Sequence, residues 1–120
     1  MIIRKVLIYA GGVKDYTAAS RFGELMFESP GSKNLRKVGR QLGDILGVMV
    51  KMRRAGEPAP YLLITGHGVL SGLLMVCGLE VWGEVPILIF DAKTENYNEE
   101  WVSKRTIGEY IKNLESEEAE

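Results

Sequence analysis

The only histidine of the chain lies between two glycines, in the run Thr65-Gly66-His67-Gly68, where one apolar segment ends and another begins. Glycines let a backbone approach a ligand closely, and the free amides at the start of a helix bind phosphate. An imidazole there can donate a hydrogen bond to a base or a ribose, transfer protons near neutral pH, or bind one metal ion. We therefore predict that Thr65, Gly66 and Gly68 bind a ligand and that His67 is catalytic. The alternative is a tight connection in which the imidazole serves only its own turn.

A carboxylate and a lysine follow the next apolar segment. Asp91 comes directly after residues 85–90, and Lys93 lies two positions later. A carboxylate at the end of a strand can bind a ribose hydroxyl or a divalent cation such as Mg²⁺ or Mn²⁺. We predict that Asp91 is a catalytic residue and a metal ligand, and that Lys93 binds the ligand. Aspartate also caps turns with its own side chain, which is the alternative role for Asp91.

The formal net charge of −1 conceals two oppositely charged halves. Residues 33–54 hold seven basic side chains and one acidic, a balance of +6, whereas residues 84–120 hold ten acidic and four basic, a balance of −6. A basic helix attracts phosphate, so Arg36, Lys37 and Arg40 are predicted to neutralise a bound anion. A solvated helix face with no ligand is the alternative.

The composition limits the class of protein. A chain of 120 residues with 46% hydrophobic and 26% charged side chains is typical of one globular domain. One cysteine and one histidine form neither an internal disulfide nor a structural zinc site. We find no stretch typical of a membrane span or a secretory signal, so we expect a cytoplasmic protein that does not enter membranes. The scarcity of glutamine beside abundant Glu, Lys and Arg suggests a thermophilic source.

Hydrophobic periodicity predicts the elements that position these residues. Strands are expected at 2–10 and 21–29, joined as a hairpin, with a short helix around Asp15–Arg21 as the competing interpretation of the connection. A helix is expected from about residue 34 to Arg54, a loop at 55–60, a strand at 61–65, an interior helix at 69–82 and a strand at 85–90. A polar loop then leads to an amphipathic helix that carries Trp101, Val102 and the apolar residues up to Leu114. The last residues, 115–120, are expected to be a frayed acidic tail.

These elements predict a single α/β domain over residues 1–114. The order β-β-α-β-α-β-α gives a mixed sheet of about four strands with a parallel βαβ unit. In an open sheet of this kind ligands bind at the carboxyl ends of the strands. We therefore expect the turn at His67 and the carboxylate of Asp91 to share one edge.

Three glycines at four-residue spacing, Gly39, Gly43 and Gly47, lie within the first long helix. Each costs about 1 kcal/mol relative to alanine in a helix interior. We expect a close approach to the sheet or to another helix to offset this cost, with the seam of a homodimer as the alternative. Cys77 is expected to be a buried thiol.

Residues 61–93 resemble the small accessory proteins of type III CRISPR systems that bind RNA ends or cyclic oligoadenylate messengers. In that family a hydrophobic strand ending in Ser-Gly-Arg-Gly-Pro precedes a helix and a strand ending in Tyr-Asp-Pro-Arg. The matching runs here are LLITGHG and PILIFDAK. The family's helix histidine falls near Leu73, which argues against a metal-dependent nuclease while leaving nucleotide binding in place.

The resemblance implies a homodimer that binds an adenylate-containing RNA or a cyclic oligoadenylate, with slow, ring-nuclease-like phosphodiester cleavage as an open question. Thr65, Gly66, His67 and Gly68 would line the ligand-binding edge, and Asp91 with Lys93 would match the family's Asp and Arg. Two alternatives remain: a non-enzymatic interaction subunit of an α/β homodimer, and an unrelated mononucleotide-binding domain.

Overall fold

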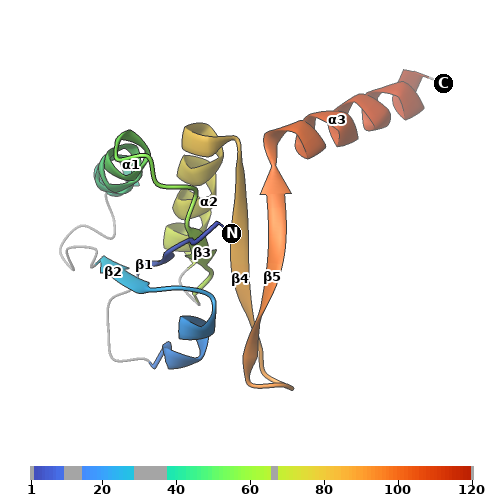
Figure 1. The fold of residues 1–120 in the computed structure, drawn as a ribbon. Helices are drawn as coiled ribbons and strands as arrows, with labels where there is room; N and C mark the ends of the chain where they lie inside the picture. The colour runs from blue at the N-terminus through green and yellow to red at the C-terminus, as the bar shows by residue number, and fades with distance from the viewer. Residues whose placement is uncertain (1, 10–14, 29–37, 66–67, 120) are drawn as a thin grey trace.

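A five-stranded sheet forms the centre of the molecule (Figure 1). The computed structural model describes residues 2–9, 15–28, 38–65 and 68–119. The strands are β1 (Val6–Tyr9), β2 (Leu25–Glu28), β3 (Tyr61–Leu63), β4 (Glu84–Asp91) and β5 (Asn96–Ser103), in the spatial order β2-β1-β3-β4-β5. The first four are mutually parallel, and β5 pairs with β4 in the antiparallel direction. The fold is therefore α/β with a mixed sheet, as expected, but with five strands rather than about four.

Helices α1 (Val38–Arg54) and α2 (Gly68–Trp82) lie side by side on one face of the sheet (Figure 1). Between them and the sheet lies the larger part of the core, which is made of Leu7, Tyr9, Ile45, Met49, Ala59, Leu62, Leu70, Leu74, Cys77, Val81, Val85 and Ile87. The short 3₁₀ helix η1 (Thr17–Arg21) covers part of the other face with Ala19 and with Tyr16, the residue before the helix. Helix α3 (Lys104–Ala119) follows β5 and extends away from these layers.

The predicted hairpin of the first two strands is wrong. β1 and β2 are parallel, with Val6 opposite Leu25 and Tyr9 opposite Glu28. Two neighbouring parallel strands need a crossover connection, and η1 is part of the one between β1 and β2. The alternative prediction of a short helix around Asp15–Arg21 is therefore confirmed.

The helix predicted from Trp101 onward is wrong at its start. Trp101 and Val102 belong to β5, opposite Pro86 and Val85 of β4. The side chains of this segment alternate between the two faces of the sheet, as in a strand. Tyr97 packs in the core cluster on one face and Val102 against the cluster on the other. α3 begins only at Lys104 and then continues to Ala119, through the segment expected to be a frayed tail.

The unit β3–α2–β4 confirms the predicted parallel βαβ crossover. Gly83 ends α2 with a positive φ of 84°, which favours glycine. α2 is not buried all round, however, because Val69 and Val76 are 49% and 55% exposed on its outer side. The start expected for α1 near residue 34 lies outside the described residues.

Candidate functional site

The strand order creates a switch point between β1 and β3. From β1 the chain moves to β2 on one side, and from β2 it crosses over to β3 on the other side. Ligands of open α/β sheets bind outside the carboxyl ends of the strands at such a point. Tyr9 ends β1 there, and Thr65 follows β3 by two residues. The neighbouring positions of β3 and β4 also bring the two predicted site segments to adjacent strands, as expected.

The connection from β3 to α2 is closed by a serine in the first turn of the helix. The Thr65 amide donates a hydrogen bond of 3.1 Å to Ser71 Oγ, which in turn donates to the Thr65 carbonyl oxygen at 3.3 Å. Ser71 is only 6% exposed. These bonds tie Thr65, before the glycine turn, to the first turn of α2, and Gly68 is exposed at the first position of that helix. Gly66 and His67 themselves lie outside the described residues.

A buried phenol stands at the end of β1. Tyr9 is 4% exposed and lies opposite Glu28 of β2. Burial raises the pKa of the Tyr9 phenol above its ordinary value, and the carboxylates of Asp44 and Glu28 raise it further. The phenol therefore stays protonated and can donate a hydrogen bond. No local pattern in the sequence indicates this cluster, because only the parallel pairing of β1 and β2 brings Glu28 beside Tyr9.

The only glutamine of the chain is the most unusual polar residue of this region. Gln41 lies on α1, one turn before Ile45, at the end of the helix that faces the carboxyl edge of the strands. It is 1% exposed, and neither Nε2 nor Oε1 has a hydrogen-bond partner within the described parts of the chain. A buried polar group without a partner costs about 1–3 kcal/mol. A group that offers both an acceptor and a donor would satisfy this amide.

The sequence itself carries a signal for Gln41. Its spacing from Ile45 and Met49 places it on the buried face of α1, where a polar side chain is exceptional. Arg40, beside it, is exposed in the first described turn of the helix. Arg36 and Lys37 lie outside the described residues.

Asp91 and Lys93 lie at the far end of the β4–β5 hairpin. Asp91 is three residues beyond Leu88, the last residue of β4 that pairs with β3. Its Oδ1 accepts a hydrogen bond of 2.9 Å from the Lys93 amide, so the carboxylate caps its own turn. Among the described residues, no group of three or more His, Cys, Asp or Glu side chains gathers to hold a metal ion, at Asp91 or elsewhere. Cys77 is buried, as expected, and burial raises the pKa of its thiol.

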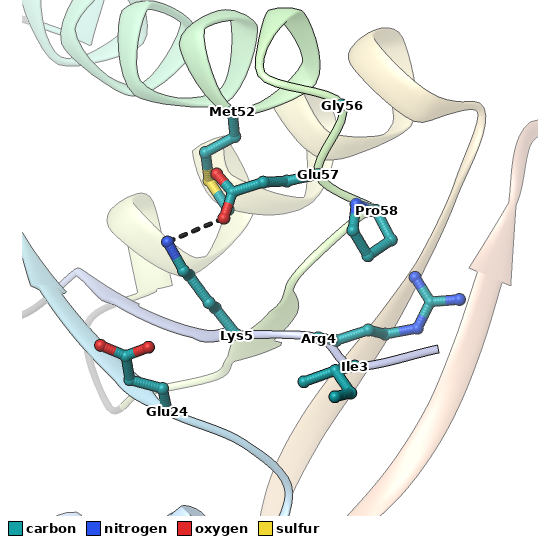
Figure 2. Close-up of a pocket in the computed structure, with 8 residues that line it drawn as sticks. All are labelled: Ile3, Arg4, Lys5, Glu24, Met52, Gly56, Glu57 and Pro58. Atoms are coloured by element: carbon teal, nitrogen blue, oxygen red, sulfur yellow. Dashed lines mark ion pairs between the residues drawn. The ribbon is translucent and has the colours of Figure 1, made fainter. Parts of the chain in front are cut away.

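A pocket of about 330 Å³ lies at the opposite, amino edge of the strands (Figure 2). Figure 2 shows Lys5 reaching Glu57, and the two charged atoms are 2.7 Å apart. The guanidinium of Arg4 points away from this ion pair. It donates a hydrogen bond of 2.8 Å to the Ala59 carbonyl oxygen and lies over the Trp101 ring, 5.0 Å from the ring centroid. Both cations of this pocket already have protein partners, so the carboxyl edge is the stronger candidate.

Of the helices within the described residues, none has both the length and the apolar character that crossing a membrane requires. Comparison of the chain with protein-family profiles, curated proteins and solved structures finds no match. The fold and the geometry of the carboxyl edge therefore carry the functional argument.

Proposed function

We propose that the protein binds an adenine nucleotide, within an adenylate-containing RNA or a cyclic oligoadenylate, at the carboxyl edge of β1 and β3. The buried, unpartnered carboxamide of Gln41 is the observation that carries this proposal. A carboxamide offers one acceptor and two donors, and a bidentate pair with N6 and N7 of adenine is its commonest base contact. Binding of the base would supply the two hydrogen bonds that Gln41 lacks.

The remaining groups of the edge fit the sugar and the phosphate. Asp44 and Glu28 beside the Tyr9 phenol offer acceptors for ribose hydroxyls. The amides at the start of α2, from Gly68, suit a phosphate, and Ser71 with Thr65 holds that helix end in place. These assignments give each described residue of the edge a different part of the nucleotide.

The predicted residues complete the proposal. His67 and Gly66 would contact the phosphate and its sugar, and Arg36, Lys37, Arg40 and Lys93 would neutralise charge. In slow phosphodiester cleavage, the His67 imidazole would take the proton of the ribose 2′-hydroxyl as its oxygen attacks the phosphorus. The bond from phosphorus to the 5′-oxygen would break, and that oxygen would leave as a hydroxyl after taking a proton from water or from the imidazolium. Asp91 would contribute only through a divalent cation that takes its other oxygen ligands from water and from the phosphate.

The test is a calorimetric titration of the full chain with AMP, GMP, a short linear oligoadenylate and cyclic oligoadenylates. We expect adenylate ligands to bind and to raise the unfolding temperature by several degrees at saturating concentration. Gln41→Leu should lower the affinity by about 1–3 kcal/mol, or roughly 5- to 150-fold. The same variant should be more stable than the parent protein without ligand, because an unpartnered amide has been removed.

Glu57→Gln is the matched control, since it breaks the ion pair at the opposite edge of the sheet without touching the carboxyl edge. It should leave adenylate affinity unchanged. If no adenylate binds, or if AMP and GMP bind equally well and Gln41→Leu binds like the parent, the proposal fails.

A second candidate is an interaction subunit without enzymatic activity. The observation that favours it is a group of four large apolar side chains on α3 that are 44–67% exposed. This role concerns a different surface and does not exclude nucleotide binding.

A further inference from the structure

Helix α3 stands away from the body of the protein (Figure 1). From Lys104 to Glu117, every residue except Gly108 is exposed. Its apolar side chains nevertheless form one stripe at the spacing of a helix face, made of Ile107, Tyr110, Ile111 and Leu114, which are 44%, 67%, 49% and 58% exposed. A helix of 16 residues depends mainly on packing of such a stripe for its stability. The stripe therefore lacks a partner within the described chain.

The start of α3 is nonetheless fixed. Ser103 caps the helix, since its Oγ accepts a hydrogen bond of 3.0 Å from the Thr106 amide. The Lys104 amide donates to the Gly83 carbonyl oxygen at 3.0 Å, and its ammonium pairs with Glu80 at 2.7 Å. These contacts hold the base of α3 beside the end of α2. The helix is thus presented in one direction rather than tethered loosely.

A matching groove lies beside this base, on the outer side of α1 and α2. Two open hollows of about 480 Å³ each share Val50 and Arg54. The first is lined also by Leu46, Gly47 and Lys51, and the second by Arg53, Glu80 and Val81. The floor is apolar and the rim is mainly basic. We call this surface the α1–α2 groove.

The glycine row on α1 leads into the α1–α2 groove. A Cβ atom added at Gly39, Gly43 or Gly47 would meet no atom within 4 Å among the described residues. The expected close approach to the sheet or to another helix of the same chain is therefore wrong for these glycines. Because these positions have no side chain, the outer surface of α1 is shallow there, and the backbone of another helix can approach it closely.

We propose that α3 of one protomer docks in the α1–α2 groove of a second copy of this chain, and that the contact is reciprocal. Charge complementarity supports this occupant. Glu115 lies four residues after Ile111 and Glu117 three after Leu114, so both flank the apolar stripe. They match Lys51 and Arg54 on the rim of the groove. The lengths also agree, since the stripe and the groove each cover two helical turns, about 10–12 Å.

A second copy fits better than the same chain. The base of α3 is tied to Glu80, which itself lines the groove, and from there the helix leads away from its own protomer. A two-fold axis would bring each α3 to the partner's groove while burying both stripes at once. This inference stands on surfaces distant from the carboxyl edge, so it does not rest on the proposed nucleotide binding.

The experiment measures the mass of the full chain by light scattering and sedimentation over a range of concentrations. The parent protein should be a dimer. Ile111→Asp should weaken dimerisation at least about tenfold, because it places a charge in the apolar stripe. Gly47→Leu should do the same by filling the groove, although its Cβ has open space in the isolated chain. Lys112→Asp, on the polar face of the same helix, is the matched control and should remain dimeric.

Charge reversal identifies the occupant. Lys51→Glu with Arg54→Glu should weaken the dimer, and Glu115→Lys with Glu117→Lys should do so separately. Mixing the two double variants should restore association as a mixed dimer, because each supplies the charges that the other needs. A parent protein that is monomeric at all concentrations overturns the proposal. In that case α3 would pack on its own protomer or bind a different protein. A dimer that survives both Ile111→Asp and Gly47→Leu overturns it as well.

Discussion

At the scale of single residues, the buried carboxamide of Gln41 distinguishes the carboxyl edge from the rest of the core. Gln41 is 1% exposed and has no hydrogen-bond partner among the described residues, whereas Tyr9, 4% exposed, is buried to the same degree as Tyr97 on the other face of the sheet. Polar groups buried at such a cost are common at binding sites, where a ligand completes their bonding. The same edge holds the carboxylates of Glu28 and Asp44, which act on Tyr9 electrostatically.

The phenol of Tyr9 should make stability depend on alkaline pH. Its pKa is raised in the folded state, so below pH 10 the phenol is protonated in both states and its contribution to stability is fully present. Above that pH the unfolded chain releases the proton more readily, and stability falls. Urea unfolding between pH 8 and pH 11 should show this decline.

Tyr9→Phe should reduce the alkaline decline without abolishing it, because burial also raises the pKa of Tyr61 and Tyr97. The control is Tyr110→Phe in the Ile111→Asp background, where the proposed dimer is weakened and Tyr110 is 67% exposed on α3. An identical pH dependence for the parent and Tyr9→Phe would contradict the role assigned to burial.

At the scale of elements, glycine has two different uses in the helices. Gly78 of α2 lies against the sheet, where an added Cβ would be 2.8 Å from Val85 Cγ1 and 3.0 Å from Leu62 Cδ1. Gly43 of α1 faces outward, and an added Cβ there would meet nothing within 4 Å among the described residues. The close approach of a helix to the sheet therefore occurs at α2, not at α1, where the four-residue spacing suggested it.

Alanine substitutions should separate these uses. Gly78→Ala should lower the free energy of unfolding by about 1–3 kcal/mol, because the stiff side chain of Val85 cannot move aside easily. Gly43→Ala should raise it by roughly 0.5–1 kcal/mol in a monomeric background such as Ile111→Asp, through helix propensity alone. Chemical denaturation measures both. Equal effects of the two substitutions would mean that the packing of α2 on β3 and β4 is looser than described.

At the scale of the whole molecule, both the charge distribution and the shape favour a dimer that exchanges α3. The molecule measures 52 × 35 × 31 Å, and in Figure 1 α3 extends from the body beyond the sheet. Basic residues gather at the end of α1, and Glu115, Glu117 and Glu118 gather at the end of α3. A reciprocal exchange of α3 would neutralise both ends and give a more compact assembly.

Removal of residues 105–120 should therefore change association more than folding. We expect the unfolding temperature of the full chain to rise with protein concentration, as for any dimer that is more stable than its monomer. The shortened chain should unfold at a temperature independent of concentration and keep the secondary structure of the sheet. Calorimetric scans over a hundredfold range of concentration would measure this, and a concentration dependence that survives the deletion would exclude α3 as its cause.

The sequence by itself determined the elements whose pattern is local. The apolar segments of β1, β3 and β4 and the periodicity of α1 and α2 identified these elements and the βαβ unit, because side-chain spacing depends only on backbone geometry. The glycine turn at residues 65–68 was likewise placed at the end of a strand and the start of a helix. Its role as a binding site stays a prediction.

Only the tertiary structure decided which strands pair and which side chains meet. β2 is parallel to β1, and the segment with Trp101 is a strand rather than a helix. In both cases, pairing with a neighbouring strand outweighs the weak secondary-structure preference of the local sequence. The same pairing brought Glu28 beside Tyr9, and the packing of α1 buried Gln41. The edge at which a ligand would bind is made by residues distant in sequence, and no local pattern could have assembled it.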